Sequence, residues 1–169
     1  MWQLKAFSEF SAQELFEIYQ ARVAVFVVEQ NCAYQEVDEK DLKALHLFAK
    51  NSAKLTAYCR IIPEQDSLHI GRVLVTKEAR GTGLAKQLMT QALTVCQQKW
   101  QNENVYVQAQ AYLQDFYQSF GFKPISEVYL EDGIPHLDMV RCVHVFVREV
   151  IGMQRSGEYI CKYCKTLKV

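Results

Sequence analysis

The residues with the clearest chemical meaning form a basic, glycine-rich run directly before a helical apolar pattern, Arg80-Gly81-Thr82-Gly83-Leu84-Ala85. A helix N-terminus has backbone N–H groups without partners and a partial positive charge, so it binds anions. The glycines let an anion approach the backbone closely, and Arg80 adds a fixed charge suited to a pyrophosphate. The run therefore predicts a ligand that carries phosphates.

Two common phosphate-binding motifs do not fit this run. No Gly-Lys-Ser/Thr follows the glycines, which excludes a P-loop. The acidic ribose partner and the alternating parallel strands of a dinucleotide-binding fold are also missing from the sequence pattern. A Gly-x-Gly before a helix is often only a turn, so the elements on either side of it are needed to tell whether this one binds phosphate.

The elements around the run can be predicted from capping and periodicity. Ser11 and Glu14 form a capping box, which predicts that a first helix begins at about Ser11. The apolar stripe from Leu84 to Trp100 predicts a second helix directly after the glycines. Short β-rich segments, separated by turn-like residues, predict a three-stranded meander over residues 44–49, 54–62 and 68–75.

The rest of the pattern predicts a strand, a short helix and a hairpin. The strand covers residues 104–109, the helix covers 113–120, and the hairpin turns at Asp132-Gly133, a pair that favours a tight turn. This order predicts an α+β fold with one mixed, mostly antiparallel central sheet and helices on both of its faces. The length fits a single domain.

Composition excludes several classes of protein. Nineteen basic and nineteen acidic residues cancel, so the net charge indicates neither a nucleic-acid partner nor an anionic membrane surface. The longest apolar run, Val23 to Val28, is far shorter than the roughly 20 residues of a membrane-spanning helix. No secretory signal is visible at the amino terminus, so we expect a cytoplasmic protein.

The glycine run and the strand before it resemble motif A of the GNAT N-acetyltransferase superfamily. In that family an apolar strand precedes Arg/Gln-x-x-Gly-x-Gly/Ala, and here Val73-Leu74-Val75 precedes the run. The family's next signature, a helix bearing Tyr with Gly-Phe four residues on, is matched by Tyr117 and Gly121-Phe122. Residues 22–41 and 127–139 resemble the ElaA-type branch, so the resemblance covers residues 1 to about 140.

The resemblance implies a GNAT fold and an acyl-CoA-dependent N-acyltransferase. The expected reaction moves an acetyl group from acetyl-CoA to a primary amine by direct attack, with no metal. The strand at 73–75 is expected to splay from its neighbour and to place an N–H of Leu74 or Val75 near the thioester oxygen. The expected coenzyme-binding residues are Val73, Leu74, Val75, Arg80, Gly81, Thr82, Gly83, Leu84, Ala85, Gln110, Phe116 and Tyr117.

The resemblance also indicates catalytic residues. Tyr117 is the expected general acid, because a phenol with a pKa of about 10 can protonate a thiolate whose thiol lies near 8.5. Without the family match, Tyr117 is equally interpretable as a core residue between Phe116 and Phe120. We name Glu29 as catalytic base, from a group that borders the expected acceptor cleft, namely Glu29, Glu36, Asp38, Glu131 and His136.

The acceptor and even the activity stay open at this point. Glu29, Glu36 and His136 are the expected substrate-binding residues, and carboxylates there favour a cationic acceptor such as a polyamine, a small amine or a peptide lysine. One alternative is a GNAT-like module that binds acyl-CoA without transferring the acyl group. Another is an enzyme that uses a longer acyl group or an amino-acid thioester.

The resemblance ends before the C-terminal extension. We divide the chain into an acetyltransferase domain, residues 1–140, and an extension, residues 141–169, with an extra strand near Val143 to Arg148 and a tail. That strand could pair with a second subunit, which would make a homodimer. Cys161 and Cys164 have the spacing of half a zinc site, but ordinary thiols are the favoured interpretation. Four further cysteines in apolar stretches are expected to be reduced thiols: Cys32, Cys59, Cys96 and Cys142.

Overall fold

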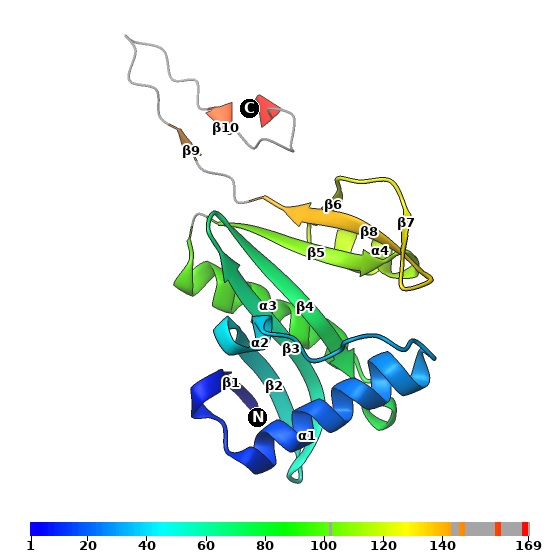
Figure 1. Cartoon of the computed structure of the whole chain (residues 1–169). Coiled ribbons are helices and arrows are strands. Elements are labelled where there is room, and N and C mark those ends of the chain that lie inside the picture. The colour runs from blue at the N-terminus through cyan, green and yellow to red at the C-terminus, as the bar shows by residue number, and fades with distance from the viewer. Residues whose placement is uncertain (102, 143–145, 148–157, 160–166, 169) are drawn as a thin grey trace.

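The computed structural model describes residues 1–101, 103–142, 146–147, 158–159 and 167–168, and its core is one mixed sheet (Figure 1). Strands follow the order β1-β2-β3-β4-β5-β8-β6, with β7 paired to β8. The pairing of β4 with β5 is parallel, and the other pairings of this sheet are antiparallel. The strands are β1 (Trp2–Ala6), β2 (Leu45–Asn51), β3 (Lys54–Glu64), β4 (Ser67–Val75), β5 (Asn104–Gln110), β6 (Lys123–Pro124), β7 (Tyr129–Glu131) and β8 (Ile134–Arg141).

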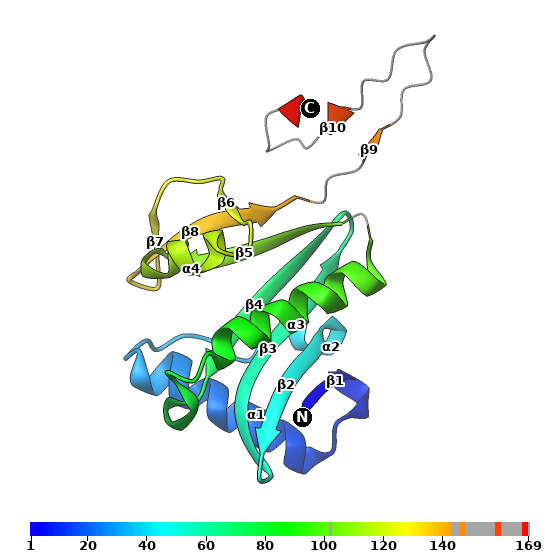
Figure 2. The ribbon, with the colours of Figure 1, turned by 180° about the vertical axis from the view of Figure 1, so that it is seen from behind.

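The two longer helices, α1 and α3, cover opposite faces of the sheet, as the views from front and back show (Figures 1 and 2). Each packs on its own apolar cluster, around Ile18 for α1 and around Leu88 for α3. The predicted α+β fold with helices on both faces is therefore confirmed. The helices are α1 (Ala12–Arg22), α2 (Lys40–Lys43), α3 (Leu84–Lys99) and α4 (Gln114–Gln118), with short turns η1 (Phe7–Glu9), η3 (Lys77–Ala79) and η4 (Ala111–Leu113).

The capping box predicted at the first helix is present. The Glu14 N–H donates to Ser11 Oγ at 3.2 Å, and the Ser11 N–H donates to the Glu14 carboxylate at 3.0 Å. Beyond Arg22 the helix widens into a π-helical segment, η2 (Val23–Glu29), which periodicity did not predict. Such segments are rare and are frequent at functional sites.

The other locally encoded elements also agree with the sequence. The predicted stripe of α3 is buried at Leu88, Met89, Ala92 and Cys96. At the β7–β8 turn both Asp132 and Gly133 have positive φ, as a tight hairpin turn requires. The short helix is smaller than predicted at both ends: Leu113 belongs to the 3₁₀ turn η4, and α4 ends at Gln118 with Ser119 as its C-cap. The edge strand β1 was not predicted.

The central feature of the sheet is the early separation of β4 from β5. The two strands pair only from Ser67 with Asn104 to His69 with Tyr106. Beyond that point β4 stays paired with β3 up to Val75, whereas β5 stays paired with β8 up to Gln110. The two halves of the sheet therefore diverge and leave the facing edges of β4 and β5 without a neighbouring strand.

The described cysteines depart from expectation at one position. Cys32, Cys59 and Cys96 are free and buried, as predicted. Cys142 is disulfide-bonded, so the prediction of a reduced thiol there is wrong. Cys161 and Cys164 lie outside the described residues.

The extension is described only in part. Within the predicted extra strand, Phe146–Val147 forms β9, and residues 143–145 and 148 lie outside the described residues. The short strand β10 (Glu158–Tyr159) pairs with β9 on one side and with β11 (Leu167–Lys168) on the other. No helix of the described chain has the length and apolar character needed to cross a membrane. In the same residues no three His, Cys, Asp or Glu side chains gather as metal ligands would.

A buried ionic network joins α1 to the loop before β2 and to β3. The side chain of Arg22 is fully buried, and it donates to Glu36 Oε1 at 2.8 Å and to Asp41 Oδ1 at 2.9 Å. Arg60 on β3 also donates to Asp41 Oδ1, at 2.7 Å. Removing one member of such a network leaves an uncompensated buried charge, which is far more costly than losing an exposed pair.

Replacing Arg22 by Met should therefore destabilise the fold by about 3–5 kcal/mol in urea unfolding, because Glu36 and Asp41 lose a buried cation. The matched control is Lys43→Met, which breaks an exposed pair with Glu64 and should change the free energy of unfolding by no more than about 0.5 kcal/mol. Equal effects of the two substitutions would show that the buried network contributes no more to the free energy of unfolding than an exposed ion pair.

Candidate functional site

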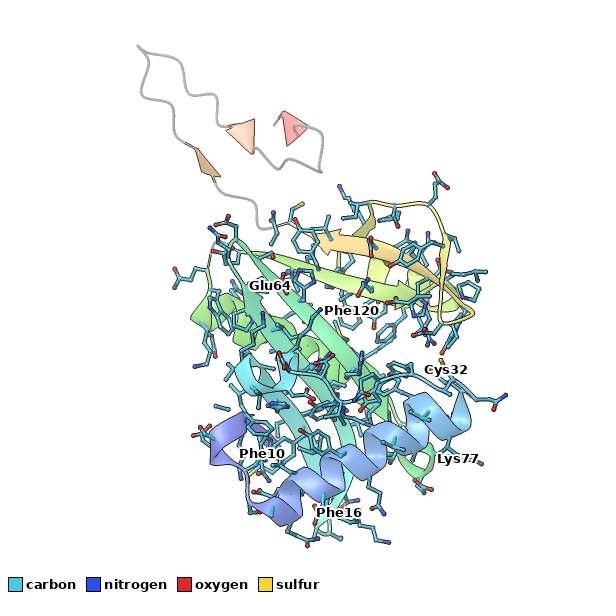
Figure 3. The ribbon with its side chains drawn as sticks, in the orientation of Figure 1. Phe10, Phe16, Cys32, Glu64, Lys77 and Phe120 are labelled. Atoms are coloured by element: carbon cyan, nitrogen blue, oxygen red, sulfur yellow. The ribbon has the colours of Figure 1, made fainter. Side chains whose placement is uncertain are left out.

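The gap between β4 and β5 is a pocket with a volume of about 600 Å³. Its walls come from β4, the outer half of β5, η2 with the loop that follows, the segment from η4 to α4, and the β7–β8 hairpin. In Figure 3, Cys32 lies beyond the end of the α1–η2 segment, toward this hairpin, and its thiol is 3.6 Å from the Asp132 carbonyl oxygen. A volume of this size is typical of ligand-binding sites.

The glycine turn presents unpaired backbone donors beside this pocket. Gly81 and Gly83 have φ of 77° and 79°, and a Cβ built on either would meet no atom within 4 Å. The hydrogen bonds of α3 begin with Lys86 and Gln87, which donate to the Gly83 carbonyl. Within the described chain the N–H groups of residues 81–85 have no acceptor. The turn therefore has the geometry predicted for an anion site.

Arg80 connects this turn to η2. Its Nε donates to the Val75 carbonyl at 3.1 Å, and its two terminal nitrogens donate to the two carboxylate oxygens of Glu29, at 2.5 and 2.9 Å. The hydrogen bond from Arg80 holds the pKa of Glu29 below its usual value. Glu29 thus lines the pocket beside the glycine turn as a paired, ionised carboxylate. These contacts favour a structural role for Glu29 over the proton transfer expected from the sequence.

A β-bulge interrupts β4 at the middle of the pocket wall. Tyr58 pairs with Leu74 and Arg60 with Gly71, so Arg72 and Val73 both lie opposite Cys59. Arg72 has φ of 54°, which is the left-handed region. The bulge changes which residues face which side: Val73 packs on the α3 side and Leu74 on the α1 side. Beyond His69 the backbone of β4 borders the pocket instead of β5.

Tyr117 both packs in the core and lines the pocket. Its side chain is 5 % exposed and makes edge-to-face contacts with Phe116 and Phe122, at centroid distances of 5.2 and 5.8 Å. Its hydroxyl has no hydrogen-bond partner among the described residues. Burial raises the pKa of the phenol, so Tyr117 stays protonated at physiological pH. That is the protonation state a general acid needs.

His136 lines the same pocket as Tyr117. It is opposite Gln110 in the β5–β8 pairing and stacks on Tyr129. Its Nδ1 is 2.8 Å from the Ile134 carbonyl, which can only accept, so in the neutral ring Nε2 has a free lone pair. Its neighbour Leu137 belongs to the core cluster that contains Tyr117. Because side chains alternate along a strand, His136 and Tyr117 belong to opposite faces of the sheet.

Not all of the other predicted site residues line the pocket. Gln110 lines the pocket and donates to the Gln30 side chain at 3.1 Å, and Phe116 also lines it. Glu36 does not line the pocket, because its carboxylate accepts from Arg22 at 2.8 Å and from Arg72 at 2.7 Å and is 4 % exposed. It is therefore part of the buried ionic network, not a free carboxylate for a substrate.

Sequence analysis did not select several residues of the pocket wall: Tyr34, Lys40, Arg60 and Arg72. Arg60 and Arg72 stand in strand-like runs, where a basic residue is normally a solvent-facing position of the alternating pattern. The bulge that turns Arg72 into the pocket begins beside Gly71, and an isolated glycine inside a strand is a signal for a bulge that could have pointed to Arg72. No comparable local signal marks Tyr34, Lys40 or Arg60.

Comparisons with known proteins agree with this geometry. A family model described as "Acetyltransferase (GNAT) domain" matches residues 7–142. Protein ElaA of Escherichia coli strain K12 is 48 % identical over 145 residues, which cover 83 % of this chain and 95 % of ElaA. A UPF0039 protein of Schizosaccharomyces pombe is 49 % identical over 138 residues, covering 80 % and 92 % of the two chains.

Comparison with solved structures agrees with these sequence matches. The crystal structure of Escherichia coli ElaA matches with a TM-score of 0.81 and 46 % identity, covering 83 % of this chain and 99 % of that one. An acyl-CoA N-acyltransferase from Pseudomonas aeruginosa matches with a TM-score of 0.80 and 42 % identity, covering 84 % and 99 %. With the family model and these relatives in agreement with the splayed strands and the glycine turn, the chain belongs to the GNAT acetyltransferase family, in its ElaA-like branch.

Proposed function

We propose that this GNAT-family acyltransferase moves an acetyl group from acetyl-CoA to a primary amine by direct attack, without a covalent acyl-enzyme. The observation that carries the proposal is the continuity of one pocket from Arg80, at the glycine turn, along the unpaired edge of β4 to Tyr117 and His136. The donor is thus anchored at one end while the reacting groups meet at the middle.

The coenzyme would be held mainly by backbone groups. The free N–H groups of residues 81–85, together with Arg80, would bind the pyrophosphate. The edge of β4 from Val73 to Val75 would pair with the pantetheine arm, because its backbone groups have no strand beside them. An N–H of Leu74 or Val75 would stabilise the oxyanion that develops on the thioester carbonyl.

Two side chains would move the protons. The amine nitrogen attacks the carbonyl carbon, the carbon–sulfur bond breaks, and the excess proton of the attacking nitrogen passes to His136 Nε2. Tyr117 gives its phenolic proton to the departing thiolate. The two residues belong to opposite faces of the sheet, so the thioester between them can be attacked from one side and leave from the other.

Turnover of acetyl-CoA against a panel of amino acids, polyamines, aminoglycosides and peptides tests the transfer. Formation of an acetylated amine supports the proposal, and longer acyl donors in the same assay define the acyl preference. A protein that binds coenzyme A yet acetylates nothing in the panel would instead be an acyl-CoA-binding module.

The coenzyme site can be tested at Gly83. Gly83→Ala should weaken coenzyme A binding about tenfold in calorimetry, because a Cβ enters the open space where the anion approaches. Gly133→Ala is the matched control: Gly133 has the same φ of 79° and equally open surroundings, so it carries the same backbone strain without the coenzyme. Equal loss of affinity in both variants would remove the turn from the coenzyme site.

The general acid can be tested by Tyr117→Phe. We expect kcat to fall on the order of 10²-fold with little change in the KM for acetyl-CoA. Because burial raises the pKa of Tyr117, the wild-type rate should not decline through loss of this proton up to about pH 10. Tyr19→Phe on α1 removes a hydroxyl outside the pocket and should leave kcat unchanged. A Tyr117→Phe enzyme with wild-type kcat would contradict the assignment.

The general base can be tested by comparing His136→Gln with Glu29→Gln. His136→Gln should lower kcat on the order of 10²-fold, because the attacking nitrogen loses its proton acceptor. Glu29→Gln should keep most of the wild-type kcat, because the Glu29 carboxylate is already bonded to both terminal nitrogens of Arg80. The opposite result, a large loss of kcat only in Glu29→Gln, would return the base to Glu29.

A further inference from the structure

Arg72 is the basic member of the ionic network that faces the pocket with a donor to spare. The charged side chains of the pocket wall away from the glycine turn are balanced, with the cations Lys40, Arg60 and Arg72 beside the carboxylates Asp38, Glu131 and Asp132. Arg60 is only 3 % exposed and both of its terminal nitrogens donate to carboxylates, and Arg22 is fully buried outside the pocket lining. Of the three arginines of the network, Arg72 is therefore the one that can bind a ligand.

Arg72 has one edge of its guanidinium bonded and the other edge open. Its Nε donates to Glu36 Oε1 at 2.7 Å and its Nη2 donates to the Glu36 carbonyl at 3.0 Å. Nη1 has no partner among the described residues, and the side chain is 21 % exposed on the pocket wall. The carboxylate of Asp38 lies 3.7 Å from Arg72 Nη2, as a longer ion pair, and its two oxygens accept shorter hydrogen bonds from Arg60, at 2.6 and 2.8 Å.

The position of this guanidinium is fixed from three directions. It lies over the rings of Tyr34 and Phe26, at 5.3 and 6.0 Å from their centroids, and Glu36 holds its inner edge. Its backbone adopts φ of 54°, where glycine would be cheaper, so the chain keeps an arginine here at a cost in backbone strain. A rigid arginine with an open edge is suited to two-point binding of a carboxylate.

We infer that the acceptor is an amino acid, whose carboxylate is bound by the open edge of Arg72 with Lys40 adding charge, while its amine is acetylated. The inference rests on the proposed transferase function and specifies its substrate. It replaces the cationic acceptor expected from Glu29 and Glu36, because both carboxylates are already paired with arginines. An acceptor without a carboxylate would leave Nη1 of Arg72 without a partner.

The test compares each of a panel of amino acids with its own amide, which keeps the amine and side chain but removes the carboxylate. With the full-length protein and acetyl-CoA, kcat/KM for the preferred amino acid should exceed that of its amide by about tenfold or more. Arg72→Gln should reduce this ratio to about one and leave coenzyme A binding unchanged. Arg72→Lys should restore part of it, because it returns the charge without the fork.

Lys40→Gln provides a second variant that does not disturb the fold, since Lys40 is exposed and outside the ion pairs of the network. It should lower the ratio by about two- to threefold, with an unchanged melting temperature. A wild-type ratio near one, or a high ratio that survives both Arg72→Gln and Lys40→Gln, would overturn the inference.

If no amine is acetylated, calorimetry of the coenzyme A-loaded protein tests the carboxylate site independently of the transfer reaction. Binding of the amino acid but not of its amide would support the carboxylate site while showing that the transferase proposal is wrong. Equal binding of both ligands, or binding of neither, would overturn the inference itself.

Discussion

The constraint on which the rest of the structure depends is that β4 and β5 do not pair beyond His69 and Tyr106. Beyond that point β4 continues along β3 and β5 continues along β8, and the two strand pairs diverge. Backbone groups on the facing edges must then find partners other than a strand. A pocket with hydrogen-bonding walls follows from this geometry, and the glycine turn, Tyr117 and His136 all lie around it.

The charged side chains of the same region form one network. Arg22, Arg60 and Arg72 balance Glu36, Asp38 and Asp41, so the network is neutral as a whole. Such burial adds little stability compared with an apolar core, but it fixes which loop lies on which strand. Here it holds the loop over residues 30–41 against the bulge of β4 and places Arg72 on the pocket wall.

Features encoded by neighbouring residues were predictable. The capping box at Ser11, the buried stripe of α3 and the Asp132-Gly133 turn each depend on contacts within a few positions, and each was confirmed. The partners of Glu29 and Glu36 were not predictable, because the arginines that bind them are 51 residues away for Glu29 and 14 and 36 residues away for Glu36. The sequence does not distinguish a carboxylate that is free to bind a substrate from one that is already paired with an arginine.

The amino-acid sequence by itself determined the family, the α+β order and the glycine turn, because a helix stripe, a cap and a φ-permissive residue are local properties of the chain. Only the tertiary structure decided where β4 leaves β5, which face Arg72 turns toward, and which carboxylates remain for chemistry. Those outcomes depend on pairing between distant segments and on burial of charge, and both are settled by packing of the whole sheet.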